Sequence, residues 1–229
     1  MKTAILSILF SVLAVGNLEA ASKAPAAERL QEAADLVTEM MATADKGVPQ
    51  DLLNKSRCVV LVPGLKKGGL IFGVKYGRGF VSCRKPGGVG WSAPAAIRVE
   101  GGSFGIQGGV SEQDVLLLVM NDSGMKHLLS NKFTLGGEAT AAAGPVGRDV
   151  SAQTDAVMRA EMLSYSRSRG LFAGISLQGA TLRPDVDSNR ELYGRDIENS
   201  EILSGKVAIP ASAQKLESLL NKNSSRLTK

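Results

Sequence analysis

The sequence has few of the residues that most often perform chemistry in proteins. Its 229 residues include one histidine, two cysteines and one tryptophan. A serine nucleophile needs a histidine within reach, and no serine lies in a G-x-S-x-G turn. His127, Cys58 and Cys83 do not supply the four ligands of a structural metal site. We therefore expect a non-catalytic protein without metal or cofactor; a hydrolase with a buried carboxylate pair is the enzyme class left open.

The sequence also lacks a hydrophobic run long enough to cross a bilayer. The run Ala4–Val15 falls well short of the roughly 20 apolar residues that a transmembrane helix needs. It follows Lys2 and precedes the small residues around Ala20, which is the layout of a secretory signal peptide. We predict that residues 1–20 are a signal peptide and that the mature protein is secreted or periplasmic; a retained membrane anchor is the alternative.

Acidic residues are absent between Asp51 and Glu100, although bases are frequent there. This block contains Lys55, Arg57, Lys66, Lys67, Lys75, Arg78, Arg84, Lys85 and Arg98. The net charge of the whole chain is only +5, so the entire positive excess belongs to this block. Six of these bases flank or interrupt the expected strands, where turns could gather them on a rim: Lys66, Lys67, Lys75, Arg78, Arg84 and Lys85.

Such a rim would attract anionic lipid headgroups, because each exposed cation near an anionic membrane contributes on the order of 1 kcal/mol. A solvated basic face that only aids solubility is the alternative. A second basic spot is expected from Arg148, Arg167 and Arg169, since the two latter residues share strand parity. Equally, these arginines could pair with carboxylates such as Asp149, Asp155 or Glu161.

The two cysteines lie in the same basic block. In an oxidising compartment Cys58 and Cys83 could form a disulfide, which would stabilise the fold by roughly 3 kcal/mol. Two separate buried thiols are equally compatible with the sequence.

The periodicity of apolar residues predicts one helix, a long run of strands and a helical tail. Apolar residues recur on one helical face over residues 26–44, and Pro49 opens a short helical turn. Short β-branched and aromatic runs separated by glycines follow over residues 57–121. A short helix over residues 125–129 and an extended segment over residues 133–143 come next.

The second half of the chain predicts a strand pair and further helices. Residues 160–168 and 171–177 favour a hairpin, and residues 185–193 and 211–220 favour helices. We therefore expect a single α+β domain with a mostly antiparallel sheet or barrel, an N-terminal amphipathic helix and C-terminal helices. The expected boundaries are residues 26–193 for the domain and 194–229 for a helical C-terminal extension.

Five ordered blocks of the sequence resemble the SYLF domain, also called the Ysc84 actin-binding domain. They lie between residues 26 and 193: Lys66–Gly69 with Tyr76–Gly79, Trp91–Pro94, Phe133–Gly137, Ala142–Arg148 and Ser164–Leu177. With its export signal, the chain is similar to the exported bacterial type of this family.

The resemblance implies a non-catalytic module that binds phosphoinositides and other acidic lipids, and some eukaryotic members also bind actin filaments. We expect reversible binding to an anionic lipid membrane surface through the basic rim, with peripheral membrane association and no nucleic-acid partner. The alternative function is a protein–protein interaction module that binds an envelope protein, as the relatives bind actin.

Overall fold

The structure is a computed structural model that describes residues 25–42, 47–69, 72–104, 109–147, 159–168 and 171–228. The predicted signal peptide, residues 1–20, lies outside the described residues. The helices are α1 Ala26–Ala42, α2 Gln50–Lys55, α3 Asp122–Leu129, α5 Val186–Tyr193, α6 Asn199–Glu201 and α7 Gln214–Asn223. A π-helical turn, η3 Ile202–Lys206, continues α6, and a 3₁₀ turn, η4 Ala211–Ala213, leads into α7.

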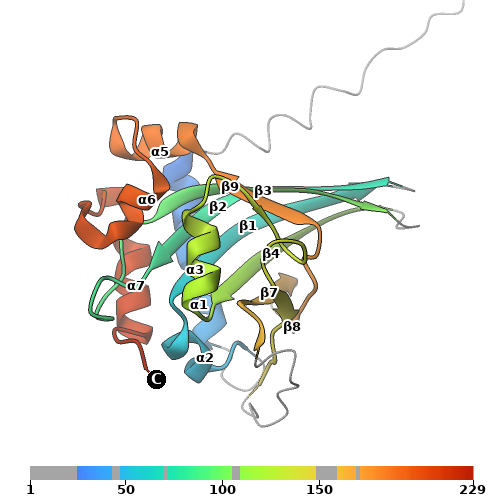
Figure 1. Cartoon of the computed structure of the whole chain (residues 1–229), viewed down its shortest axis with the longest axis horizontal. Coiled ribbons are helices and arrows are strands. Elements are labelled where there is room, and N and C mark those ends of the chain that lie inside the picture. The colour runs from blue at the N-terminus through green and yellow to red at the C-terminus, as the bar shows by residue number, and fades with distance from the viewer. Residues whose placement is uncertain are drawn as a thin grey trace, which may run out of the picture.

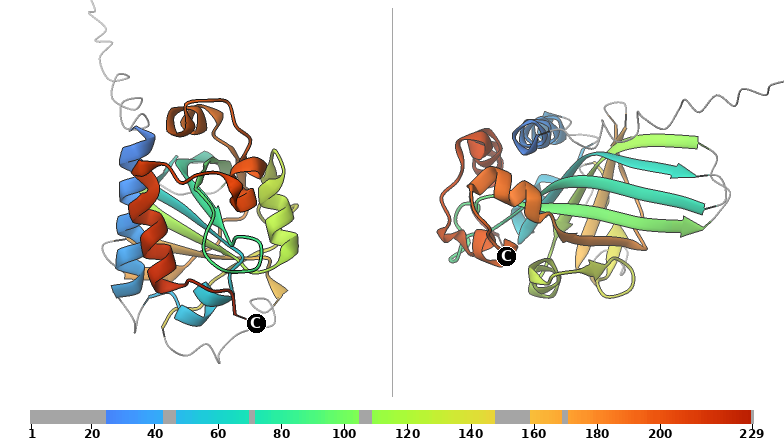
Figure 2. Two further views of the ribbon diagram at one scale, coloured as in Figure 1. Left: turned by 90° about the vertical axis from the view of Figure 1, so that its left-hand side faces the viewer. Right: turned by 90° about the horizontal axis from the view of Figure 1, so that it is seen from above.

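The strands form one curled sheet, around which the helices are arranged (Figures 1 and 2). They are β1 Cys58–Gly69, β2 Phe72–Cys83, β3 Ala95–Phe104, β4 Gly109–Val119, β5 Phe133–Thr134, β6 Ala141–Ala143, β7 Met162–Ser168, β8 Leu171–Gly174 and β9 Ala180–Pro184. The order is β5-β9-β3-β2-β1-β4-β7-β6, and β8 pairs with β7. Only the β6–β7 pairing is parallel among the described strands. The predicted α+β class with a mostly antiparallel sheet is confirmed.

The first helix forms where the apolar periodicity predicts it. Leu30, Ala33, Val37 and Met40 lie on one face of α1 and are almost completely buried. This face packs on the sheet and on α7, which runs beside α1 although it comes from the other end of the chain (Figure 2, left). The acidic residues of α1 lie outside this stripe, as expected for a helix docked on a core.

The two faces of the sheet carry two separate cores, because successive residues of a strand point to opposite sides. One face, here called the α1 face, contributes Val59, Leu61 and Leu116 to the core under α1 and α7. The other, here called the α3 face, contributes Val60 and Leu117 to a core that includes residues of α3, β5 and η3. Strand parity therefore determines which side of the molecule each charged residue can reach.

Strands β1 to β4 are longer than the sequence predicts, because glycines that we interpreted as breaks lie inside them, whereas β8 ends at Gly174, before the predicted residue 177. Gly79 is a central residue of β2, and a Cβ atom there would lie 2.1 Å from the carbonyl oxygen of Leu61. Gly101 in β3 has a similar contact, 2.8 Å from the carbonyl oxygen of Gly179. These glycines allow neighbouring strands to approach closely rather than ending them.

The long strands β1–β4 give the sheet two distinct ends. At one end, here called the basal end, Cys58 and Cys83 are register partners and are joined by a disulfide, so the first of the two alternatives for these cysteines holds. At the other end, here called the distal end, the strands project beyond the rest of the molecule (Figure 1). Since β2 runs from Phe72 to Cys83, the two ends are about 35 Å apart.

Replacing Gly79 with alanine should test the close approach of the strands. The added methyl group would clash with the backbone of β1, so we expect Gly79→Ala to lower the free energy of unfolding by about 2 kcal/mol or more. Gly102→Ala in β3 is the matched control, because a Cβ atom there would lie 3.9 Å from its nearest neighbour. Urea unfolding followed by circular dichroism measures both; equal effects would contradict this explanation.

Candidate functional site

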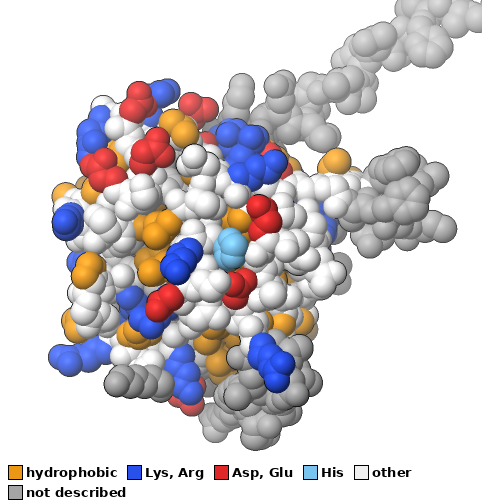
Figure 3. Space-filling view, viewed as in Figure 1, with side chains coloured by type: hydrophobic (Ala, Val, Ile, Leu, Met, Phe, Trp, Pro, Cys, Tyr) orange, Lys and Arg blue, Asp and Glu red, His pale blue; other side chains and the backbone are white. Residues whose placement is uncertain are grey.

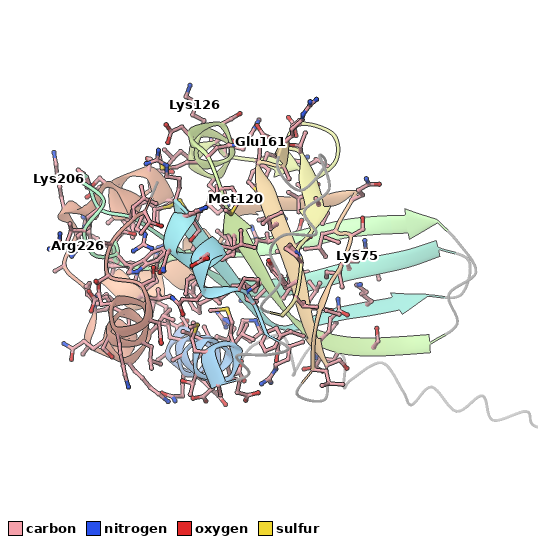
Figure 4. The ribbon with its side chains drawn as sticks, turned by 90° about the horizontal axis from the view of Figure 1, so that it is seen from below. Lys75, Met120, Lys126, Glu161, Lys206 and Arg226 are labelled. Carbon is pink, nitrogen blue, oxygen red and sulfur yellow. A yellow bond between two sulfur atoms is a disulfide. The ribbon has the colours of Figure 1, made fainter. Side chains whose placement is uncertain are left out.

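Three of the six predicted rim residues lie together at the distal end. Lys66 and Lys67 are within three residues of the end of β1, and Lys75 is within three residues of the start of β2. Figure 4 shows Lys75 among the projecting strands. At about 3.3 Å per residue, all three side chains begin within about 10 Å of the end of the described strands.

Lys67 and Lys75 form a pair of like charges on the α3 face. They are direct register partners across β1 and β2, so their Cβ atoms are about 5 Å apart. Burial and the neighbouring charge of Lys75 lower the pKa of Lys67. The Lys75 ammonium donates a hydrogen bond to the carbonyl oxygen of Gln178, at 3.4 Å. Neither lysine makes an ion pair with any described residue.

The α1 face of the distal end combines one lysine with exposed apolar side chains. Lys66 lies opposite Tyr76 and Glu112. One step closer to the end, Val74 and Val110 flank Gly68 and are 66% and 85% exposed. We did not identify these valines from the sequence. Each is an apolar residue two positions from a polar residue of the same strand, near the glycine-rich end of that strand, and this pattern could have indicated them.

Arg78 is part of a structural ion pair instead of the rim. Its Nε atom lies 3.3 Å from Oδ2 of Asp185, which is buried, and donates a hydrogen bond to the hydroxyl of Tyr76 at 2.9 Å. The Asp185 carboxylate also caps α5, where it accepts a hydrogen bond from the Ser188 hydroxyl. Arg78 therefore anchors α5 to the sheet, and its charge is largely compensated.

Arg84 is buried at the basal end, so its assignment to an exposed rim is wrong. Its guanidinium lies 3.9 Å from the centre of the Trp91 ring and donates hydrogen bonds to the carbonyl oxygens of Leu53, Ser56 and Ser224. The Trp91 indole donates to the same Ser224 carbonyl, at 2.7 Å. Burial lowers the pKa of Arg84 to about 10. Arg84 thus holds together three parts of the chain.

Lys85 lies beside Arg84 and is therefore about 30 Å from Lys75 along β2. The predicted continuous rim of Lys66 to Lys85 does not exist as one surface. Its members are distributed between two ends and two faces of the sheet, because adjacent strand residues alternate between faces. On the face shown in Figure 3, basic and acidic side chains are intermixed.

Only one member of the second predicted basic spot lies among the described residues. Arg167 in β7 lies between two carboxylates: its Nη2 atom is 2.7 Å from Asp114, and Nη1 contacts Glu39 of α1. These partners differ from the carboxylates that the sequence suggested. Arg148 and Arg169 lie outside the described residues. The Lys66, Lys67 and Lys75 cluster, with Val74 and Val110, is therefore the candidate site and is called the distal cluster below.

The described residues contain neither a candidate membrane-spanning helix nor a candidate metal site. No helix among them is both long and apolar enough to span a membrane. No group of three or more potential His, Cys, Asp or Glu ligands within the described ranges could hold a metal ion.

Comparison with known proteins finds relatives over most of the chain. The family model Ysc84, described as Las17-binding protein actin regulator, matches residues 100–223. SH3 domain-containing YSC84-like protein 1 of Rattus norvegicus is 35% identical over 178 residues, which are 77% of this chain and 52% of that protein. Protein YSC84 of Saccharomyces cerevisiae is 31% identical over 189 residues, or 81% of this chain and 40% of that protein. The chain thus spans about half the length of these relatives or less.

Replacing Arg84 tests whether it has a structural role. Arg84→Gln removes the charge-assisted hydrogen bonds to three carbonyl oxygens and the stacking of the guanidinium on Trp91, so we expect a loss of about 3 kcal/mol in the free energy of unfolding. Arg226→Gln, an exposed arginine near the same C-terminal segment, should change it by less than about 0.5 kcal/mol. Thermal and urea unfolding measure both variants. A stability of Arg84→Gln equal to that of the unchanged protein would contradict the assigned role.

Proposed function

Since the chain belongs to the Ysc84 family, we propose that it is a non-catalytic binding module that adsorbs reversibly to anionic lipid surfaces through the distal cluster. The proposal extends to a secreted or periplasmic location with peripheral membrane association. The arrangement of Lys66, Lys67 and Lys75 around exposed valines at the projecting end of the sheet supports it most directly.

The distal cluster combines the two interactions that attach proteins to membrane surfaces. Three cations near an anionic surface contribute about 1 kcal/mol each. Transfer of Val74 and Val110 from water into the interface adds about 1.5 kcal/mol or more for each side chain that becomes buried. Lys66 lies on one face and the Lys67–Lys75 pair on the other, so an approach along the strands brings all three ammonium groups to the surface.

The absence of catalysis is part of the proposal, and the surroundings of His127 support it. Its Nε2 atom lies 3.7 Å from Glu161, and the Ser123 hydroxyl donates to the same carboxylate instead of to the imidazole. A serine nucleophile needs its hydroxyl bonded to the base. Glu161 also accepts a hydrogen bond from the backbone N–H of Thr140, so its carboxylate ties α3 to the sheet.

A protein-binding module is the second candidate function. The printed description of the family, Las17-binding protein actin regulator, favours it. For this chain the corresponding partner would be an envelope protein or a filament that resembles actin.

Sedimentation with vesicles tests the lipid proposal. The protein should sediment with phosphatidylcholine vesicles in proportion to their phosphatidylglycerol content, and less at high salt, because exposed charges are screened over about 10 Å at 0.1 M. The triple variant Lys66→Glu, Lys67→Glu and Lys75→Glu should lose at least about 3 kcal/mol of binding free energy, or about a hundredfold in affinity.

The control has the same change of charge at other surfaces. Lys126, Lys206 and Lys222 are exposed on α3, η3 and α7, and their replacement with glutamate should reduce binding much less. Equal losses of vesicle binding in both triple variants would show that only net charge matters. Unchanged vesicle binding of the variant with Lys66, Lys67 and Lys75 replaced would exclude the distal cluster as the binding site. Sedimentation with actin filaments, without vesicles, tests the second candidate separately.

A further inference from the structure

The basal end contains a pocket that the lipid proposal does not use. It has a volume of about 430 Å³ and lies between α3, the segment that follows β2, η3 and the C-terminal segment. Lys126, Lys206 and Arg226 lie within two residues of lining residues, and Figure 4 shows them on the side of the molecule away from Lys75. A volume of this size is within the range of about 300 to 1,000 Å³ that is usual for small-molecule sites.

The walls of the pocket are mainly apolar. Met125 and Leu129 of α3 form one side and Leu203 of η3 another, and Pro86 and Leu227 are further apolar residues of the lining. Leu129 is 39% exposed, although its neighbour Leu128 is buried in the core. Leu129 therefore presents apolar surface at the pocket that no described part of the chain covers fully.

The charged groups in the lining are all positive. Arg57 and Lys85 line the pocket together with the buried Arg84, and no carboxylate side chain is among the lining residues. Arg57 is half-exposed and pairs through its Nε atom with Asp122, at 3.2 Å. Lys85 makes no ion pair with a described residue; its Cβ and Cγ atoms pack along Gly205, and its ammonium group lies near Gly90. An apolar pocket with cations in its lining complements a molecule with an apolar body and one negative end.

We propose that this pocket binds a monomeric amphipathic carboxylate, with an alkyl chain against Met125, Leu129 and Leu203 and the carboxylate near Lys85 and Arg57. Lys85, which has no ion-pair partner among the described residues, balances the charge of the carboxylate, and Arg57, which also pairs with Asp122, adds to the attraction, while the alkyl chain covers apolar surface that is otherwise exposed to water. The site is about 30 Å from the distal cluster, so it does not depend on membrane adsorption.

Calorimetric titration with decanoate below its micelle concentration, without vesicles, tests this proposal. We expect saturable one-to-one binding that weakens about fourfold for each CH₂ group removed from the chain. Decanol should bind about tenfold more weakly than decanoate because it has no charge, and decylamine should bind more weakly still.

Variants locate the site. Leu129→Glu places a negative charge on an exposed position of the wall and should weaken decanoate binding more than tenfold, whereas Lys85→Gln should weaken decanoate binding but leave decanol binding unchanged. Lys222→Gln, outside the pocket, is the control. Circular dichroism and the melting temperature verify that each variant is folded. The proposal is overturned by absence of saturable binding, by decylamine binding as tightly as decanoate, or by unchanged binding in Leu129→Glu.

Discussion

The buried guanidinium of Arg84 is the interaction on which the basal end of the molecule depends. A charge removed from water must be given hydrogen-bond acceptors, and here the acceptors are carbonyl oxygens of Leu53 in α2, of Ser56 after α2 and of Ser224 after α7. Trp91 stacks on the guanidinium and donates to the same carbonyl oxygen of Ser224. The C-terminal segment is thereby fixed to the sheet, and α7 is held beside α1.

Strand parity is the second constraint, and it divides the basic block of the sequence. Lys66 and Lys67 are adjacent in β1, so they must point to opposite faces. Arg78, farther along β2, reaches Asp185 and becomes part of the attachment of α5. Lys66, Lys67 and Lys75 share a position near the distal end of the strands, whereas Lys85 lies at the basal end. The basic block of the sequence is therefore divided between the two ends of the sheet, and three of its lysines remain together at the distal end.

Much of the fold could be predicted from local patterns. The apolar period of α1 and the β7–β8 pairing follow from the sequence, and so do the positions of α2, α3 and α5. The extent of β1–β4 could not, because a glycine that ends a strand and one that allows another backbone to approach look the same in one sequence. Gly79 becomes interpretable only when Leu61 is seen beside it. β9 was missed because Ala180–Pro184 is short and contains a proline.

The candidate site was harder to predict than the fold. Arg84 and Ser224 are separated by 140 residues, and Arg167 and Glu39 come from distant elements, so no local pattern reveals that these arginines are occupied. The valines of the distal cluster are ordinary strand residues in the sequence, and only the projection of the strands leaves them exposed.

The length of β1–β4 has a geometric consequence for a protein attached by its distal end. The strands then act as a spacer that keeps the disulfide and the C-terminal segment at a height of about 35 Å, several times the screening length of physiological salt. The charges of a ligand bound at that height are electrostatically screened from the membrane surface below. The sheet itself thus sets the distance between the membrane surface and the basal end of the protein.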